Sequence, residues 1–236
     1  RQMCIRDRDV YGNNLITVSA DELLDCGAIL PPTVNVHTVD TVRTREEVAD
    51  IDAETVLRVI EADDAERVLV SAPSARIINA MMAFTDIFRE LRSRDYNVMT
   101  ITSKHGAIIN GVKTSRAKFF EALDQFSNRG EKFVLFHYSI LSEGINVHGL
   151  TNVVLLRNLS TVEMAQTIGR VIRLDSVDRK RVSDGTLQPR AYHNYRKPTG
   201  YISVPVYNNY GKNTAKRVQR TVDTIFKAGR PATSWI

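Results

Sequence analysis

The sequence lacks the residues and segments on which several classes of protein depend. Only two cysteines, Cys4 and Cys26, occur among 236 residues, too few for a disulfide framework and consistent with a reducing cytoplasm. The five histidines are scattered and do not follow the spacing of a zinc site. No apolar run approaches the length that crosses a bilayer. We therefore expect a cytoplasmic globular protein with no membrane partner and no metal site of its own.

The sequence also lacks G-x-x-x-x-G-K-[ST], the phosphate-binding loop of many nucleotide hydrolases. Asn110–Thr114 and Tyr210–Asn213 come nearest to it, but neither follows a buried strand with the required glycines, so we expect both to be loops. An acidic group at Asp63, Asp64 and Glu66 lies at the end of an expected helix. We interpret it as a solvated turn.

Positive charge is what the sequence has in excess. Lys and Arg number 32 against 27 Asp and Glu, which gives a net charge of +5 and an isoelectric point near 9.3. The hydrophobic share of 43% is that of an ordinary globular protein. This balance favours a polyanionic partner such as nucleic acid.

Apolar strands alternate with amphipathic helices along most of the chain, which predicts an α/β fold with a parallel sheet and helices on both faces. Ligands of such sheets bind where strands end, so polar loops after neighbouring strands should share one edge. We expect strands at 33–39, 67–72, 97–102, 133–136, 152–156 and 201–207, helices at 20–26, 52–62, 75–93, 115–126 and 214–226, and a loop at 103–112.

The segment Gln166–Arg173 reads Q-x-x-G-R-x-x-R and follows Ser160 and Glu163, the two positions of a capping box. We expect one helix face to carry Gln166, Arg170 and Arg173. Neighbouring guanidiniums favour a polyphosphate, whose oxygens match their planar donors. The alternative is a basic, solvated helix face. The opposite side of this helix should be apolar, through Val162, Ala165, Ile168, Val171 and Ile172.

Four consecutive features together resemble motifs V and VI of superfamily 2 helicases: the strand at 133–136, the turn S-E-G-I-N at 142–146, the strand at 152–156, and Q-x-x-G-R-x-x-R. The strand at 67–72 and the helix after it are similar to motif IV. Residues 25–32 are similar to the crossover between the two helicase lobes. The resemblance runs from Thr33 to the C-terminus and implies a RecA-like fold, the second of the two lobes.

The resemblance also implies roles for individual residues. Arg170 and Arg173 would be arginine fingers on the γ-phosphate of ATP, assisted by Gln166. Three further residues would lie near the nucleotide: Gly144, where the backbone comes close, Glu143, which would orient a motif VI arginine, and Asn146, where many relatives carry Asp. The expected nucleic-acid-binding residues are Ser71, Ser74, Ser103, Lys104, Tyr138 and Ser139, although many relatives carry Thr near the last two.

We expect three segments. Residues 1–8 look like the translated scar of a sequencing adaptor and should be disordered, residues 9–40 would be a remnant of lobe one with the crossover, and residues 41–236 would be the helicase C-terminal domain. The phosphate loop and the ligands of Mg²⁺ would then lie on a missing first lobe. The full-length protein would be an ATP-dependent helicase or translocase, and the fragment alone would be inactive.

Several alternatives stay open. The partner would be single- or double-stranded nucleic acid, with DNA preferred because the segments after motif VI suggest phage-encoded helicases. The chain could also be the motor lobe of a restriction or repair enzyme. A third alternative is a non-catalytic nucleic-acid-binding module with a RecA-like fold.

Overall fold

The computed structural model describes residues 18–39, 47–138, 147, 149–207 and 211–226. The expected scar at 1–8 lies outside these ranges. So do four of the predicted site residues: Ser139, Glu143, Gly144 and Asn146.

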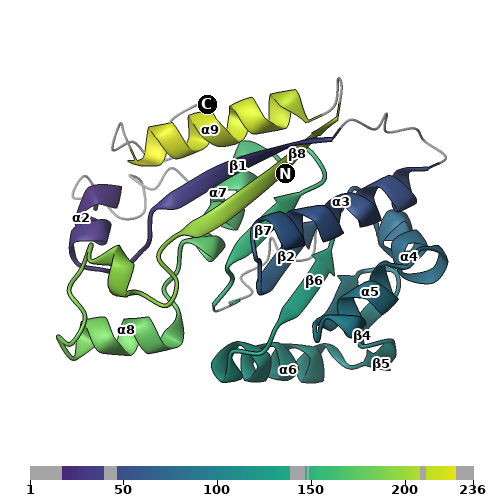
Figure 1. Ribbon diagram of the computed structural model, residues 1–236, viewed down its shortest axis with the longest axis horizontal. Helices are drawn as coiled ribbons and strands as arrows, with labels where there is room; N and C mark the ends of the chain where they lie inside the picture. The colour runs from purple at the N-terminus through teal and green to yellow at the C-terminus, as the bar shows by residue number, and fades with distance from the viewer. Residues whose placement is uncertain (1–17, 40–46, 139–146, 148, 208–210, 227–236) are drawn as a thin grey trace, which may run out of the picture.

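One eight-stranded sheet organises the described part of the chain, in the order β1-β8-β7-β2-β6-β3-β4-β5 (Figure 1). The strands from β1 to β3 in this order pair in parallel, as predicted, and β4 and β5 pair antiparallel. β1 pairs along its full length with β8. The strands are β1 (Pro32–Val39), β2 (Arg67–Ser71), β3 (Asn97–Thr102), β4 (Gly106–Ile109), β5 (Val112–Thr114), β6 (Phe133–His137), β7 (Asn152–Leu155) and β8 (Gly200–Tyr207).

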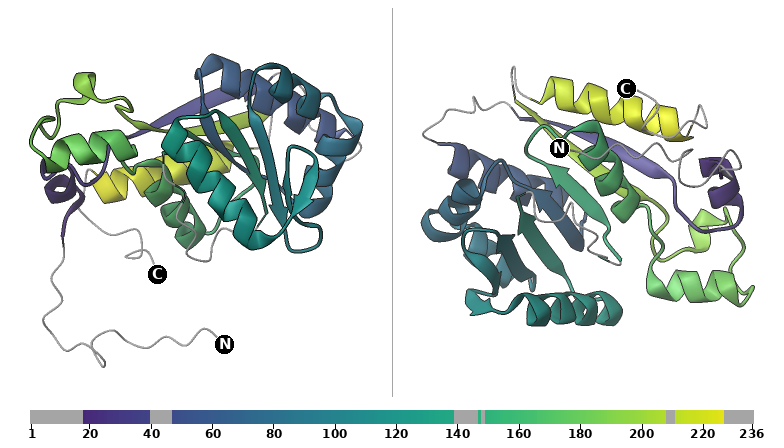
Figure 2. Two further views of the ribbon diagram at one scale, coloured as in Figure 1. Left: turned by 90° about the horizontal axis from the view of Figure 1, so that it is seen from below. Right: turned by 180° about the vertical axis from the view of Figure 1, so that it is seen from behind.

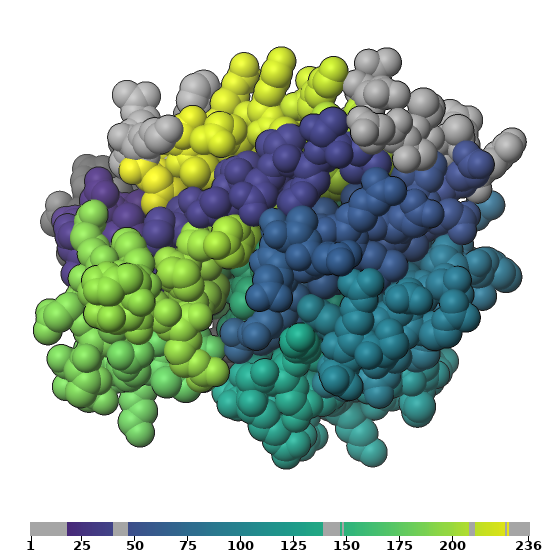
Figure 3. All heavy atoms as spheres, viewed as in Figure 1, coloured from purple at the N-terminus to yellow at the C-terminus, as the bar shows by residue number. Residues whose placement is uncertain are grey.

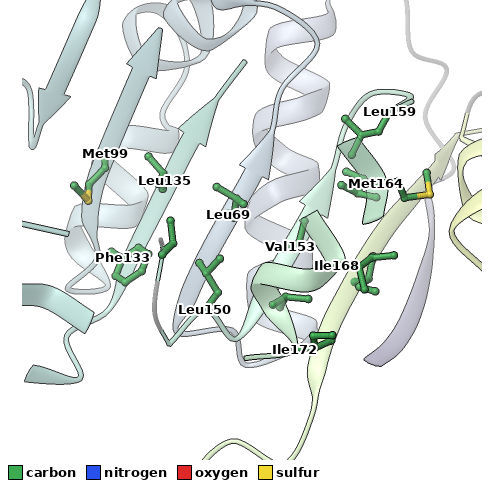
Figure 4. Close-up of a cluster of buried hydrophobic side chains, with 14 of the residues drawn as sticks. Leu69, Met99, Phe133, Leu135, Leu150, Val153, Leu159, Met164, Ile168 and Ile172 are labelled. Atoms are coloured by element: carbon green, nitrogen blue, oxygen red, sulfur yellow. The ribbon is translucent and has the colours of Figure 1, made fainter. Parts of the chain in front are cut away.

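Helices cover both faces of the sheet (Figure 2). Side chains of α3, α4 and α5 pack in one core cluster, and side chains of α6, α7 and α9 pack in the other. Figure 4 shows the second cluster, where Met164 and Ile168 of α7 meet Val153 of β7. The helices are α2 (Ala20–Asp25), α3 (Val48–Ala62), α4 (Ala75–Phe84), α5 (Ile87–Ser93), α6 (Arg116–Arg129), α7 (Thr161–Val171), α8 (Ser176–Ser183) and α9 (Lys212–Phe226), with a 3₁₀ turn η2 (Tyr192–Asn194).

The predicted loop at 103–112 is wrong, because β4 and β5 form a hairpin there. Ala107 is 4% exposed and packs in the core. Asn110 and Gly111 connect the strands with φ angles of 50° and 83°. Asn-Gly with two positive φ angles is the preferred two-residue turn of a hairpin, so the sequence contained the signal.

The predicted single helix at 75–93 is also wrong, because it breaks between α4 and α5. Thr85 is extended, with a ψ angle of 168°. Its hydroxyl donates to the carbonyl of Met81 at 2.7 Å and accepts from the amide of Ile87 at 3.3 Å. Phe84, the last residue of α4, is 85% exposed at this break.

Asp63 is not the solvated turn that the sequence suggested. It follows α3, and its side chain is only 5% exposed. Its carboxylate accepts hydrogen bonds from Asn35 at 2.9 Å, Ser203 at 2.6 Å and Asn152 at 3.3 Å. Since these donors lie on β1, β8 and β7, one carboxylate ties three strands to the end of a helix.

The same surroundings set the ionisation of Asp63. Burial raises the pKa of this carboxyl group, but nearby His37 and the hydrogen bonds from Ser203 and Asn35 outweigh burial, so the pKa lies below its usual value of 3.8. The stabilisation from the carboxylate is therefore fully present above pH 3.8. It is lost as the pH falls through the lower folded-state value.

We predict that Asp63→Asn lowers the free energy of unfolding by about 1–3 kcal/mol at neutral pH, because an amide group would then face buried donors. Denaturant unfolding measures this, and the difference from wild type should shrink below pH 3.8. The matched control is Asp64→Asn, at an exposed position with a φ angle of 45° that Asn adopts readily. Equal stabilities of the two variants would contradict the role of Asp63.

Candidate functional site

The helix α7 begins with the capping box that the sequence predicted. The Ser160 hydroxyl accepts from the amide of Glu163 at 3.2 Å, and the Glu163 carboxylate accepts from the amide of Ser160 at 2.9 Å. The second carboxylate oxygen pairs with Arg157 at 3.0 Å. The backbone hydrogen bond from Ser160 is the main cause that lowers the pKa of Glu163 to about 2. Glu163 is thus a carboxylate that orients Arg157.

The end of α7 differs from the prediction that one helix face carries both arginines. Arg170 is helical and 7% exposed, but α7 ends at Val171, and Arg173 forms a β-bridge with Ile29. The two guanidiniums nevertheless interact. Burial is the main cause that lowers the pKa of Arg170, and the charge of Arg173 lowers it further.

Groups from outside the helix donate to the carbonyls at its end and just beyond it. The ammonium of Lys197 donates to the carbonyl of Val171 and, at 2.7 Å, to that of Arg173. The amide of Leu30 donates to the carbonyl of Ile172 at 2.8 Å. The last carbonyls of a helix have no intrahelical partner, and these donors satisfy them.

The two sides of α7 follow the predicted pattern with one exception. Gln166 is exposed, and Ile168, Val171 and Ile172 are buried. The prediction that Val162 lies on the apolar side is wrong, since this residue is 49% exposed. The buried stripe instead begins at Met164, and Val162 lies off the three- and four-residue spacing that leads from Met164 to the other buried residues.

The ends of β2, β6 and β3 share one edge of the sheet, as predicted. In the parallel register, Ser71 and Ile101 both lie opposite His137. Ser103 and Lys104 are exposed just beyond β3, and Tyr138 is 36% exposed just beyond β6. These three side chains are therefore available to a partner at this edge.

The two serines after β2 have roles within the fold. Ser71 is fully buried, and its hydroxyl forms a 2.9 Å hydrogen bond with Nε2 of His137. Ser74 is half-buried and caps α4, where its hydroxyl accepts from the amide of Ile77 at 3.2 Å. Both lie at the predicted edge, beneath its exposed residues.

Sequence reasoning missed His137 and Arg157, which join this edge to α7. Burial, followed by the charges of Arg157 and Arg170, lowers the pKa of His137 to about 3, so the imidazole is neutral. The guanidinium of Arg157 lies 5.3 Å from the ring centroid of Tyr138. A basic residue directly after a buried parallel strand was the available signal for Arg157.

Lys197 is the third residue that the sequence did not single out. It is 3% exposed, and burial is the main cause that lowers its pKa to about 7, with a further contribution from the charge of Arg67. The negative charges of Asp175 and Asp178 raise the pKa and oppose this shift. Asp178 also accepts from the amide of Lys197 at 3.2 Å.

Gly200 packs directly on the end of α7 on the same side. A Cβ atom there would lie 2.5 Å from the carbonyl oxygen of Val171, closer than van der Waals contact allows. Only glycine permits this approach. Lys197 and Gly200, which we call the 197–200 clamp, therefore fix the place at which the chain leaves α7.

Two further findings bear on the chemistry available. Within the described ranges, no group of His, Cys, Asp and Glu could hold a metal ion. No helix in the same part of the chain is long and apolar enough to span a membrane.

Comparison with known proteins gives one family match. The family model described as the helicase conserved C-terminal domain matches residues 52–175, which include α7 and both arginines of interest. A search of curated proteins found no match.

Solved structures share the fold. The ATP-dependent type ISP restriction-modification enzyme LlaBIII bound to DNA matches with a TM-score of 0.59 and 16% identity, over 95% of this chain and 16% of that one. A fragment attributed to the HsdR subunit of a type I restriction enzyme from Vibrio vulnificus YJ016 matches with a TM-score of 0.54 and 21% identity. The match covers 86% of this chain and 42% of that one. The C-terminal domain of the DEAD-box protein Dbp5 matches with a TM-score of 0.46 and 15% identity. The match covers 79% of this chain and 84% of that one. The chain thus spans less than half of either restriction enzyme structure.

We predict that Lys197 makes the stability of the protein rise with pH. The folded-state pKa near 7 lies below the usual 10.5, so between these values the unfolded chain binds more protons than the folded protein. From pH 7 to 9 the free energy of unfolding of wild type should therefore gain on the order of 1–2 kcal/mol relative to Lys197→Met. Lys180→Met, at an exposed position on α8, is the control and should keep the wild-type slope. An unchanged slope in Lys197→Met would show that this ammonium is not buried.

Proposed function

Because the chain belongs to the helicase conserved C-terminal domain family, we propose that it is the C-terminal lobe of a superfamily 2 helicase and supplies arginine fingers to the ATP site of a nucleic-acid motor. The observation that carries this proposal is the position of Arg170, buried near the end of α7 beside the charge of Arg173. Two neighbouring guanidiniums produce a positive potential that suits the γ-phosphate of ATP.

The residues present fit a phosphate group better than a metal ion. Guanidiniums donate to phosphate oxygens, and no metal-binding group occurs in the described ranges. We propose that a first lobe would carry the phosphate loop and the Mg²⁺ ligands, hold ATP and supply the metal. In this proposal Arg170 and Arg173 stabilise charge on the transferring phosphoryl group, and Gln166 assists from the exposed side of α7. Glu143, Gly144 and Asn146 remain proposed nucleotide contacts outside the described residues.

The shared edge of β2, β3 and β6 is proposed as the nucleic-acid contact. Ser103, Lys104 and Tyr138 offer a hydroxyl, a cation and an aromatic ring there, which suits a phosphate backbone and its bases. Ser71 and Ser74 would support this contact at the end of β2. Ser139, which directly follows Tyr138 in the chain, remains a proposed contact. DNA is the proposed partner, in keeping with the DNA-bound restriction enzyme among the structures that share the fold.

A second candidate is the motor lobe of a restriction enzyme. It is favoured by one observation: two restriction enzyme structures, with TM-scores of 0.59 and 0.54, share the fold of this chain. This candidate keeps the same finger and nucleic-acid residues and differs only in the domains to which the motor is coupled.

We predict that Arg170→Ala and Arg173→Ala each lower the ATPase kcat of a protein that includes the first lobe by about 10³ or more. KM should change little, because the fingers act mainly on the transition state while the phosphate loop holds ATP. Steady-state ATPase kinetics with saturating nucleic acid test this. Lysine should not rescue either position, because a point charge lacks the two-pronged contact.

Arg179→Ala is the matched control, since Arg179 is an exposed arginine of α8 and its loss should leave kcat unchanged. The chain on its own should show no turnover above a mock preparation. Near-wild-type turnover in both finger variants would support the solvated-face alternative and defeat the assignment.

We predict that Lys104→Ala weakens binding of this chain to single-stranded DNA several-fold, without sequence preference, because Lys104 would contact a phosphate. Fluorescence anisotropy over a series of salt concentrations measures the affinity, and the slope of log Kd against log salt should fall by roughly one. Lys180→Ala, far from this edge in the chain, serves as the control. Salt-independent binding by wild type would contradict an electrostatic contact.

A further inference from the structure

The helix α9 has two sides of opposite character. Val218 and Val222 are buried against the sheet face that α7 also covers. The other side carries Lys212, Lys216 and Arg220, which are exposed and four residues apart, so that they form one stripe along the helix. Figure 3 shows α9 (yellow) along one side of the molecule, next to β1, and the rear view in Figure 2 shows it beside α7.

A hollow of about 480 Å³ lies between this helix and the loop that joins β7 to α7. Asn158 contributes the loop side, and the helix contributes the remaining lining residues. The hydroxyl of Thr214 donates to Oδ1 of Asn158, which leaves the amide NH₂ of Asn158 as a donor. The residues that line the hollow are Asn158, Asn213, Lys216, Arg217 and Arg220.

The chemistry of the hollow is that of an anion site. Three of its five lining residues are cations and the other two are amides, and no carboxylate lines it. Among the described residues, no Asp or Glu forms an ion pair with Lys216, Arg217 or Arg220. Cations gathered without counter-charges repel one another, so a polyanion that reaches them gains attraction and relieves this repulsion.

The hollow is connected to the proposed nucleic-acid edge. Asn158 directly follows Arg157, whose guanidinium lies over the ring of Tyr138 at the end of β6. The lining includes no aromatic residue, so bases could not stack there as they could on Tyr138. Contacts in the hollow would therefore be made to phosphates, without selection of sequence.

We propose that this hollow, which we call the α9 groove, binds the phosphodiester backbone of the same nucleic acid that contacts the strand-end edge. The proposal rests on the proposed function, because it needs a nucleic-acid partner. It extends the contact from the loops after β2, β3 and β6 across the loop after β7 to α9. A motor would thereby contact the nucleic-acid strand at a second place, separate from the residues of the strand-end edge.

The test is a charge-reversal variant of the α9 groove, Lys216→Glu with Arg220→Glu, in the 236-residue chain. Anisotropy with a fluorescein-labelled oligo-dT strand should show binding weakened by on the order of tenfold, and a slope of log Kd against log salt lower by roughly one to two, as expected for two lost phosphate contacts. Arg94→Glu with Lys180→Glu is the control, because both residues are exposed and the net charge changes equally. Equal weakening in the control would overturn the proposal.

A second measurement uses the wild-type protein and needs no substitution. Acetylation of lysines followed by mass spectrometry should show Lys216 protected by oligo-dT while Lys180 stays reactive. Unchanged acetylation of Lys216, or displacement of the oligonucleotide by poly-glutamate at the same charge concentration, would overturn a nucleic-acid site in the α9 groove. If Lys104→Ala weakens binding and the groove variant does not, this inference fails and the proposed function stands. If wild type does not bind the strand at low salt, the proposed function itself fails.

Discussion

The 197–200 clamp on the end of α7 is the constraint on which the geometry of the candidate site depends. A buried ammonium is costly unless its donors are satisfied, and Lys197 places two of its three donors on the carbonyls of Val171 and Arg173. Gly200 closes on the same turn, where a side chain would collide with the carbonyl of Val171. The helix ends at this point, so Arg170 lies on α7 while Arg173 pairs with Ile29. The two arginines are held by different structural elements yet remain close enough to interact.

Most of the fold could be predicted from the sequence because its signals are local. Strands such as Phe133–His137 are short, apolar and fully buried, and the capping box at Ser160 and Glu163 formed as the motif indicates. The hairpin at Asn110 and Gly111 could also have been predicted, because its turn signal is local. The segment was predicted instead to be a loop after the strand at 97–102, and residues 110–114 an incomplete phosphate loop.

The features that could not be predicted depend on contacts between segments far apart in the chain. Asp63 looked like a surface acid because its partners, Asn35 and Ser203, lie on strands that meet only in the folded sheet. The pattern of α7 likewise indicated a helix continuing to Arg173, and the clamp residues that end it lie more than twenty positions further on. Single-sequence periodicity contains no information about such partners. The sequence therefore predicted the helix that carries Arg170 and misjudged the geometry of Arg173.

Burial divides the cations of this lobe into two sets that suit different anions. Arg170 is almost fully buried, and in surroundings of lower effective dielectric a charge interaction at 4 Å reaches about 4 kcal/mol, against about 1 kcal/mol in water. Such a cation acts strongly on a small anion that enters without its water. Lys216 and Arg220 are exposed, where salt screens each interaction over about 10 Å. Each exposed cation interacts weakly with one phosphate, and these interactions add up along a polyanion. A strand can therefore be bound and still be released at each step. In the proposed function a motor would use both kinds, and α7 and α9 would provide them from neighbouring positions on one face of the sheet.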